Sequence, residues 1–215
     1  MHRLTRVPRM LTMRDTQVLT GPNKGKDFTE VNHKGNVPAI VLEDGTLLNG
    51  ARSGARGSNG TCSAHTDPPI SAENAATLQW VADQAPNSGL APPAGTAAHY
   101  TLLNKLSFIG TEVHQACAPL FSPCDDKVKE WGLTKLKGKL KFVAEDELKD
   151  GRMYLIGDCF TVADSYLYIV LSWMPYVGVD LAEYPVLKKY FDGIAALDFV
   201  QKAHLHMKQI EESSR

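Results

Sequence analysis

The sequence contains no apolar run that approaches the roughly 18–20 residues a helix needs to cross a bilayer. It also lacks an excess of charge of either sign, because 23 Lys and Arg residues stand against 24 Asp and Glu residues and the formal net charge is -1. This balance gives no electrostatic reason to expect a nucleic acid or an anionic membrane as partner. With 43% hydrophobic and 22% charged residues, the composition is typical of a soluble globular protein.

Cysteines are few and form no recognisable pattern. None of the four belongs to a C-x-x-C pair, and their spacing fits no zinc site. Four cysteines in 215 residues do not make a dense disulfide framework. We therefore expect free thiols, no bound metal and a cytoplasmic location. The four are Cys62, Cys117, Cys124 and Cys159.

Residues 27–48 are typical of strands and a turn. Two apolar runs, residues 37–42 and 46–48, lie on either side of Asp44-Gly45, a dipeptide that favours a tight hairpin turn. The sequence therefore predicts a β-hairpin here. The next segment, residues 49–71, is rich in Gly, Ser and Ala and has no hydrophobic periodicity, which predicts a loop or a disordered segment.

From residue 73 onward the hydrophobic period is helical. We predict helices over residues 73–84, 96–117 and 125–148, with Pro119 and Pro123 ending the second of them. A linker containing Pro92, Pro93 and Gly95 separates the first two helices. The predicted organisation is an α/β domain over residues 1–87, which includes the 49–71 insert, and an all-helical domain over residues 88–215. On the third helix we expect one apolar side, made of Val128, Trp131, Leu136, Leu140 and Val143.

The segment that follows residue 160 predicts a central helix. Thr161 is placed to cap it, and Asp164 at the third helical position makes a variant of the capping box. The helix is apolar nearly all round, which predicts a buried position. We expect Pro175 to end it, and two further helices over residues 185–197 and 199–212.

Four blocks of sequence resemble the glutathione transferases, most closely those of the bacterial, or beta, class, which also have fungal relatives. The resemblance implies a thioredoxin-like α/β domain, here truncated and lacking its first strand–helix unit, followed by an all-α helical bundle. The blocks occur in the family's order and cover most of the chain. They are FTEVNHKGNVPAIVLEDGTLL, ENAATLQWVADQAPNSGLAPP, LSFIGTEVHQACAPLF and YLIGDCFTVADSYLYIVLSW.

The resemblance implies a glutathione site in the N-terminal domain. Pro38 would follow a cis peptide bond and turn the backbone of Val37 towards the cysteinyl group of glutathione. Glu73 would accept from the α-amino group, and Asn74 would donate to the γ-glutamyl carboxylate at a helix N-terminus. Without the resemblance, Pro38 would be an ordinary trans proline, and Asn74 or Ser71 a simple helix cap.

Three further residues lie on the helix predicted over 96–117. His114 matches the family histidine near the sulfur and the electrophile pocket, where it would donate to the thiolate or polarise a substrate. Ser107 and Thr111 precede it by two turns and one turn and match positions close to glutathione, partly across the dimer interface. All three also fit packing or surface roles. The residue after the histidine is usually basic in the bacterial class and is Gln115 here.

The family's chemistry implies a glutathione transferase that conjugates an apolar electrophile lying between the N-terminal domain and residues 100–120. It further implies a homodimer that uses glutathione as co-substrate. The motif Pro-Gly-Ala-Cys-Ser, which supplies the group that activates the thiol, has no match in this sequence. Two alternatives therefore stay open: a glutathione-binding protein that does not conjugate, and a dedicated glutathione-dependent step in a biosynthetic pathway.

Overall fold

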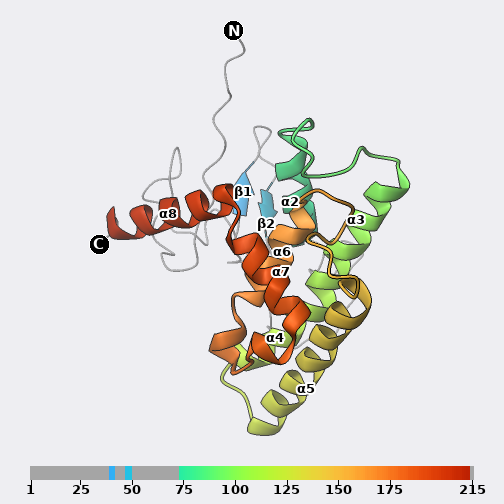
Figure 1. Cartoon of the computed structure of the whole chain (residues 1–215). Coiled ribbons are helices and arrows are strands. Elements are labelled where there is room, and N and C mark those ends of the chain that lie inside the picture. Colours follow the sequence, from blue (N-terminus) through green and yellow to red (C-terminus); the bar gives the residue numbers. More distant parts are fainter. Residues whose placement is uncertain (1–38, 42–46, 50–72, 214–215) are drawn as a thin grey trace, which may run out of the picture. The chain divides into compact units, whose positions relative to one another are not determined.

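The computed structural model describes residues 39–41, 47–49 and 73–213 (Figure 1). The chain divides into two compact units, Met1–Gln84 and Ala85–Arg215. In the first unit, strands β1 (Ala39–Val41) and β2 (Leu47–Asn49) pair antiparallel, with Ile40 opposite Leu48. The predicted hairpin is therefore confirmed. The turn of this hairpin at Asp44-Gly45 lies outside the described residues, and so do Val37 and Pro38. The loop predicted over residues 49–71 starts one residue too early, because Asn49 belongs to β2, and the rest of it lies outside the described residues.

Helix α2 (Glu73–Asp83) follows in the same unit and coincides with the predicted helix over 73–84. It packs against β2 and buries Thr77 and Ala82. Asn74 is its second residue and is partly buried. The first residues of the helix have backbone N–H groups without intrahelical acceptors, as at every helix N-terminus.

The second unit contains helices throughout its described secondary structure. One helical run is continuous over residues 97–121, because a π-helical turn joins two α-helices there. A second long helix ends in a similar π-helical turn. In chain order the elements are α3 (Ala97–Phe108), η3 (Ile109–His114), α4 (Gln115–Phe121), α5 (Asp126–Phe142), η4 (Val143–Glu147), α6 (Val162–Leu171), η5 (Met174–Val177), η6 (Leu181–Glu183), α7 (Pro185–Ala195) and α8 (Asp198–Ser213).

The predicted helix over 96–117 differs from the observed one in two respects. Thr96 caps its start by accepting the backbone N–H of His99 at 3.2 Å, but the helix continues through η3 and α4 to Phe121. Pro119 lies inside α4 and does not end it. A proline usually interrupts a helix by removing one N–H donor and crowding the carbonyl group four residues before it. Here the helix nevertheless continues for two residues beyond Pro119, to Phe121.

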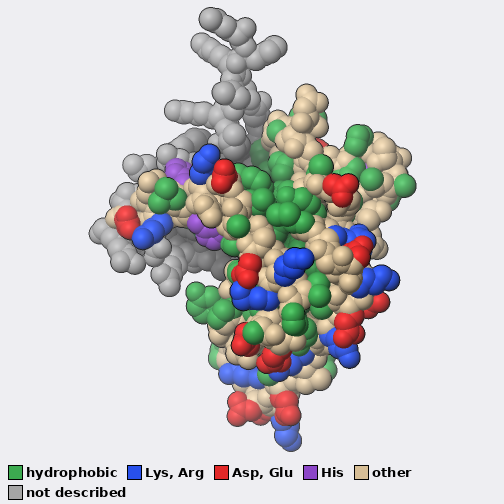
Figure 2. Space-filling model, in the orientation of Figure 1, with side chains coloured by type: hydrophobic (Ala, Val, Ile, Leu, Met, Phe, Trp, Pro, Cys, Tyr) green, Lys and Arg blue, Asp and Glu red, His purple; other side chains and the backbone are tan. Residues whose placement is uncertain are grey.

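Helix α5 packs on α4 and is capped by Asp125, whose carboxylate accepts the N–H of Lys127 at 2.8 Å. The predicted apolar side is correct for its C-terminal half, where Leu136 and Leu140 are fully buried. In the first turns the same side is not buried, because Trp131 is 60% exposed. Trp131 instead lies beneath the ammonium group of Lys135, whose Nζ is 5.6 Å from the ring centroid. Figure 2 shows acidic and basic side chains interspersed over this part of the surface.

Helix α6 forms the centre of the unit, as predicted. Eight of its ten residues are buried, and Asp164 among them is 0% exposed. The predicted capping box is present: Oδ2 of Asp164 accepts the N–H of Thr161 at 2.8 Å. The helix ends at Leu171, so Pro175 belongs to the following turn η5 and does not itself end it.

Helices α7 and α8 complete the unit and agree with the two predicted C-terminal helices. Helix α7 buries Leu187, Tyr190 and Ile194, which are spaced three and four residues apart and therefore share one face. Helix α8 buries Val200, and the residues from 201 to 209 are all exposed. The linker before α3 is tied to α6 as well, because the N–H of Val162 donates to the carbonyl oxygen of Leu90 at 3.0 Å.

Candidate functional site

The candidate site begins with the π-helical turn η3, which ends at His114. Its sequence, Ile-Gly-Thr-Glu-Val-His, combines a glycine with three β-branched residues, all of which form α-helix less readily than alanine or leucine. Ile109, Gly110 and Val113 face the interior. Single π-helical turns within α-helices occur frequently at functional sites, which directs attention to the side chains that this turn presents.

His114 belongs to an aromatic cluster of four residues: His114, Phe121, Tyr166 and Trp173. Its Nδ1 atom lies 2.8 Å from the hydroxyl oxygen of Tyr166, and the two rings meet edge to face at 5.8 Å. The indole ring of Trp173 meets the imidazole edge to face, with ring centroids 4.9 Å apart and an interplanar angle of 70°. Phe121 contacts Trp173 at 6.0 Å and remains 54% exposed. The aromatic cluster is therefore anchored at Tyr166 and reaches the surface at Phe121.

Burial lowers the pKa of the His114 imidazole, because desolvation disfavours its charged form. At neutral pH the ring is accordingly neutral, with one N–H group and one lone pair. The nearby charge of Glu112 is already paired, since its carboxylate lies 2.9 Å from the ammonium group of Lys139. That hydrogen bond with Lys139 lowers the pKa of Glu112. The imidazole can therefore act as a neutral hydrogen-bond donor.

Ser107 and Thr111 lie on the same helical run as His114. Ser107 belongs to α3 and is exposed, and Thr111 belongs to η3 and is partly exposed. The hydroxyl group of Thr111 donates to the carbonyl oxygen of Ser107 at 3.0 Å. The structure thus brings these two predicted residues together, and the hydroxyl oxygen of Thr111 retains the ability to accept a hydrogen bond.

The remaining predicted residues belong to the first unit. Val37 and Pro38 lie outside the described residues, as does the side chain of Glu73, whose backbone begins α2. Asn74 follows it as the second helical residue. Its position within the first turn of α2 agrees with the expected location at a helix N-terminus.

Sequence reasoning did not assign Tyr166, Trp173 or Phe121 to the site. Tyr166 and Trp173 lie in the segment after residue 160 whose apolar character predicts a central helix. Their separation of seven residues, two helical turns, places them on one side of a helix. That signal predicts an aromatic pair, whereas the contact with His114 depends on how η3 and α6 pack together.

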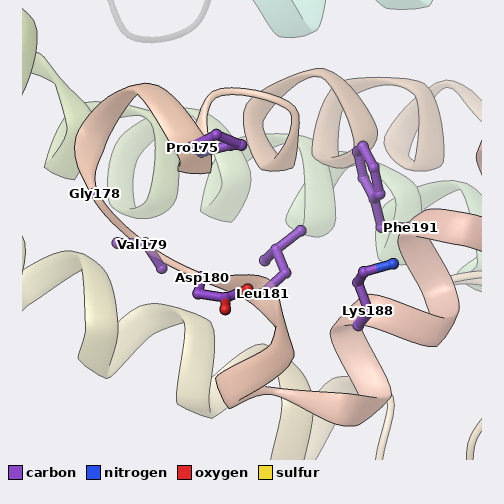
Figure 3. A pocket seen from close by; sticks show the side chains of 7 residues that line it. All are labelled: Pro175, Gly178, Val179, Asp180, Leu181, Lys188 and Phe191. Atoms are coloured by element: carbon purple, nitrogen blue, oxygen red, sulfur yellow. The ribbon is translucent and has the colours of Figure 1, made fainter.

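A hollow of about 410 Å³ lies elsewhere in the same unit, where the turns η5 and η6 meet α7 (Figure 3). Its charged groups already have partners. The ammonium group of Lys188 lies 2.7 Å from Oδ1 of Asp192, and the carboxylate of Asp180 accepts the N–H of Ala182 at 2.8 Å. The hollow contains none of the predicted site residues. It is lined by Pro175, Gly178, Val179, Asp180, Leu181, Lys188 and Phe191.

Metal-binding groups and membrane-spanning helices are absent from the part of the chain that the structure describes. Within it, no group of three or more His, Cys, Asp or Glu side chains is arranged to hold a metal ion. Within it also, no helix combines the length and the apolar character required to span a membrane.

Comparisons with known proteins agree on one family. The family model for the glutathione S-transferase C-terminal domain matches residues 92–198, which include η3, α6 and the whole aromatic cluster. Glutathione S-transferase GstA of Escherichia coli O157:H7 is 32% identical over 180 residues, covering 83% of this chain and 77% of that protein.

Solved structures give the same result. The chain is similar to a sphingomonad glutathione S-transferase complexed with glutathione, at 38% identity and a TM-score of 0.68. It is also similar to the bacterial beta class glutathione S-transferase of Sphingomonas chungbukensis, at 36% identity and a TM-score of 0.68. Each alignment covers 83% of this chain and 77% of the other. Fungal proteins occur among the other structural neighbours.

Proposed function

This chain belongs to the glutathione S-transferase family, and on that basis we propose that it transfers glutathione to an apolar electrophilic small molecule. The thiolate sulfur would attack the electrophilic carbon and form a carbon–sulfur bond. In a substitution, the leaving group departs with the bonding electron pair. In an addition, the neighbouring carbon receives a proton. Glutathione is then a co-substrate and no metal takes part.

The observation that carries this proposal is the environment of His114. A glutathione thiol titrates well above neutral pH, by analogy with cysteine at about 8.5, so stabilising the thiolate requires a donor. His114 is neutral, partly buried and held by Tyr166 through one ring nitrogen, which leaves the second for a ligand. The exposed ring of Phe121 and the partly exposed ring of Trp173 offer an apolar surface beside it.

The proposed glutathione contacts are assigned by the family resemblance. Asn74 is supported by its place in the first turn of α2, where free N–H groups favour a carboxylate. Ser107 and Thr111 are supported by their exposure on the helical run that leads to His114. The first unit would be thioredoxin-like and the working protein a homodimer. The proposed contacts are Val37, Pro38, Glu73, Asn74, Ser107 and Thr111.

A non-conjugating glutathione-binding protein is the second candidate, because the sequence has no match to the family's thiol-activating motif. Capture of the full chain on immobilised glutathione, followed by conjugation assays with an aryl halide, an activated alkene and an epoxide, distinguishes the two. Capture with conjugation supports the transferase, and capture without conjugation supports the binding protein. Failure of both overturns the proposal for either role.

Two histidine variants sharpen the assay. His114→Gln should lower kcat by about 10- to 100-fold, the effect of removing a positioned proton-bearing group. His206→Gln makes the same change on exposed α8 and should leave kcat unchanged. Equal rates in the two variants would remove His114 from the mechanism.

A further inference from the structure

Tyr166 is the polar partner of His114 and is itself almost completely buried. Its side chain projects from α6 with 8% of the residue exposed, and its hydroxyl oxygen lies 2.8 Å from Nδ1 of His114. The two residues are 52 positions apart in sequence, so the packing of η3 on α6 creates the contact. Trp173 covers the imidazole from a second direction. The ring is thus fixed in orientation by two aromatic side chains.

Either residue can be the hydrogen-bond donor in this contact. Either the Tyr166 hydroxyl donates to a bare Nδ1, or a protonated Nδ1 donates to the hydroxyl oxygen. The two arrangements leave opposite functions at Nε2, which is a donor in the first case and an acceptor in the second. A phenol hydroxyl is a more acidic and therefore stronger hydrogen-bond donor than the N–H of a neutral imidazole.

We propose that Tyr166 is a positioning residue that donates to Nδ1 of His114 and so holds the imidazole as the Nε2–H tautomer. In the neutral ring, the hydrogen is then always on Nε2, and this N–H group can donate to a ligand. Resting on the transferase function proposed above, this assigns that donor to the glutathione sulfur, whose negative charge it stabilises. In this role Tyr166 would influence the sulfur through the histidine.

The same helix supplies a matched control. Tyr168 is buried to the same degree, at 7% exposure, and its hydroxyl group lies 3.1 Å from Nε2 of His204 on α8. Replacing either tyrosine by phenylalanine therefore removes one tyrosine–histidine hydrogen bond from a buried ring of α6. Tyr166→Phe removes the hydrogen bond to His114, whereas Tyr168→Phe removes the hydrogen bond to His204.

The decisive experiment is nitrogen-15 NMR of histidine-labelled full-length protein in the absence of glutathione, with the His114→Gln spectrum identifying the His114 signals. We expect an unprotonated Nδ1 and a protonated Nε2 in the wild type. Tyr166→Phe should convert this to a mixture of tautomers, and Tyr168→Phe should leave it unchanged. A protonated Nδ1 in the wild type overturns the proposal, even if Tyr166→Phe fails to fold.

Steady-state kinetics test whether the hydrogen bond from Tyr166 helps His114 to stabilise the glutathione thiolate. Tyr166→Phe should lower kcat by about 3- to 10-fold, as expected for one lost hydrogen bond, with KM for glutathione changed less than about 2-fold. Tyr168→Phe should leave both constants within about 2-fold. An unchanged kcat in Tyr166→Phe overturns the positioning role. If the wild type conjugates no electrophile, the transferase function fails, whereas the NMR result still decides the tautomer.

Discussion

The hydroxyl group of Tyr190, on α7, donates a hydrogen bond of 2.9 Å to Oδ1 of Asp164, on α6. The same oxygen accepts the N–H of Leu155 at 2.7 Å, and Oδ2 accepts both the N–H and the hydroxyl group of Thr161 at 2.8 Å. One buried carboxylate therefore joins the start of α6, the loop before it and the helix that follows. Burial without such partners would be strongly unfavourable for an acidic group.

We predict that Asp164→Ala destabilises the protein by about 3–5 kcal/mol, because three residues lose a buried acceptor together. Tyr190→Phe removes one donor and leaves the others in place, so it should cost only about 1–1.5 kcal/mol. Urea unfolding of both variants measures the two values. A loss below about 1 kcal/mol in Asp164→Ala would contradict a structural role for this network.

A second prediction concerns two glycines of α5. A Cβ atom at Gly132 would lie 3.2 Å from Cβ of Pro119, whereas one at Gly138 would meet no atom within 4 Å. Gly138→Ala should therefore stabilise the protein by about 0.5–1 kcal/mol through helix propensity alone. Gly132→Ala should gain less or destabilise, because the rigid proline ring must move. Thermal unfolding compares the stabilities of the two variants. An equal gain in stability would show that Pro119 on α4 moves aside at no energetic cost.

A third prediction follows from the lowered pKa of His114. Between its folded pKa and the ordinary value near 6.5, the unfolded chain binds more protons than the folded one, so stability falls as the pH is lowered through this range. The slope due to this residue is at most about 1.4 kcal/mol per pH unit. His114→Gln should show a shallower loss of stability between pH 7 and 5 than the wild type. Exposed His206→Gln provides the comparison and should keep the steeper slope.

A fourth prediction concerns thiol reactivity. Burial raises the pKa of the Cys117 thiol to about 12, and its sulfur lies 3.5 Å from the carbonyl oxygen of Val113. The thiolate is the reactive species, so iodoacetamide at pH 8 should leave Cys117 unmodified in the folded protein. Cys159 is exposed and should react before Cys117. Peptide mass spectrometry before and after urea treatment reads both sites, and rapid native labelling of Cys117 would contradict the buried environment.

The sequence was most informative where local chemistry determines the structure. Thr161 and Asp164 predicted the start of α6 because a capping box involves only neighbouring residues. The end of α4 was less predictable, since Pro119 is accommodated by the helix it was expected to stop. The type and spacing of Trp131 place it on the apolar side of α5, but whether that side is buried depends on which neighbour covers each turn, and Trp131 is 60% exposed.

The candidate site was also predictable only in part. The resemblance selected His114, and the structure places it beside a partner that no local pattern could identify. Tyr166 has the period of a core residue, and its pairing with His114 spans 52 residues. Such contacts arise from the packing of one helix on another, so they become visible only when both helices are placed.

The π-helical turn at Ile109–His114 also has an evolutionary consequence. Its hydrogen bonds skip one more residue than those of an α-helix, so the turn accommodates one surplus residue between α3 and α4. Loss of a residue within this turn would restore α-helical bonding and leave both flanking helices in their present rotational phase. Loss of a residue from α4 itself would instead rotate the following side chains by about 100°. The chain therefore carries, immediately before its candidate histidine, a position where its length can change without disturbing the packing of α4 on α5.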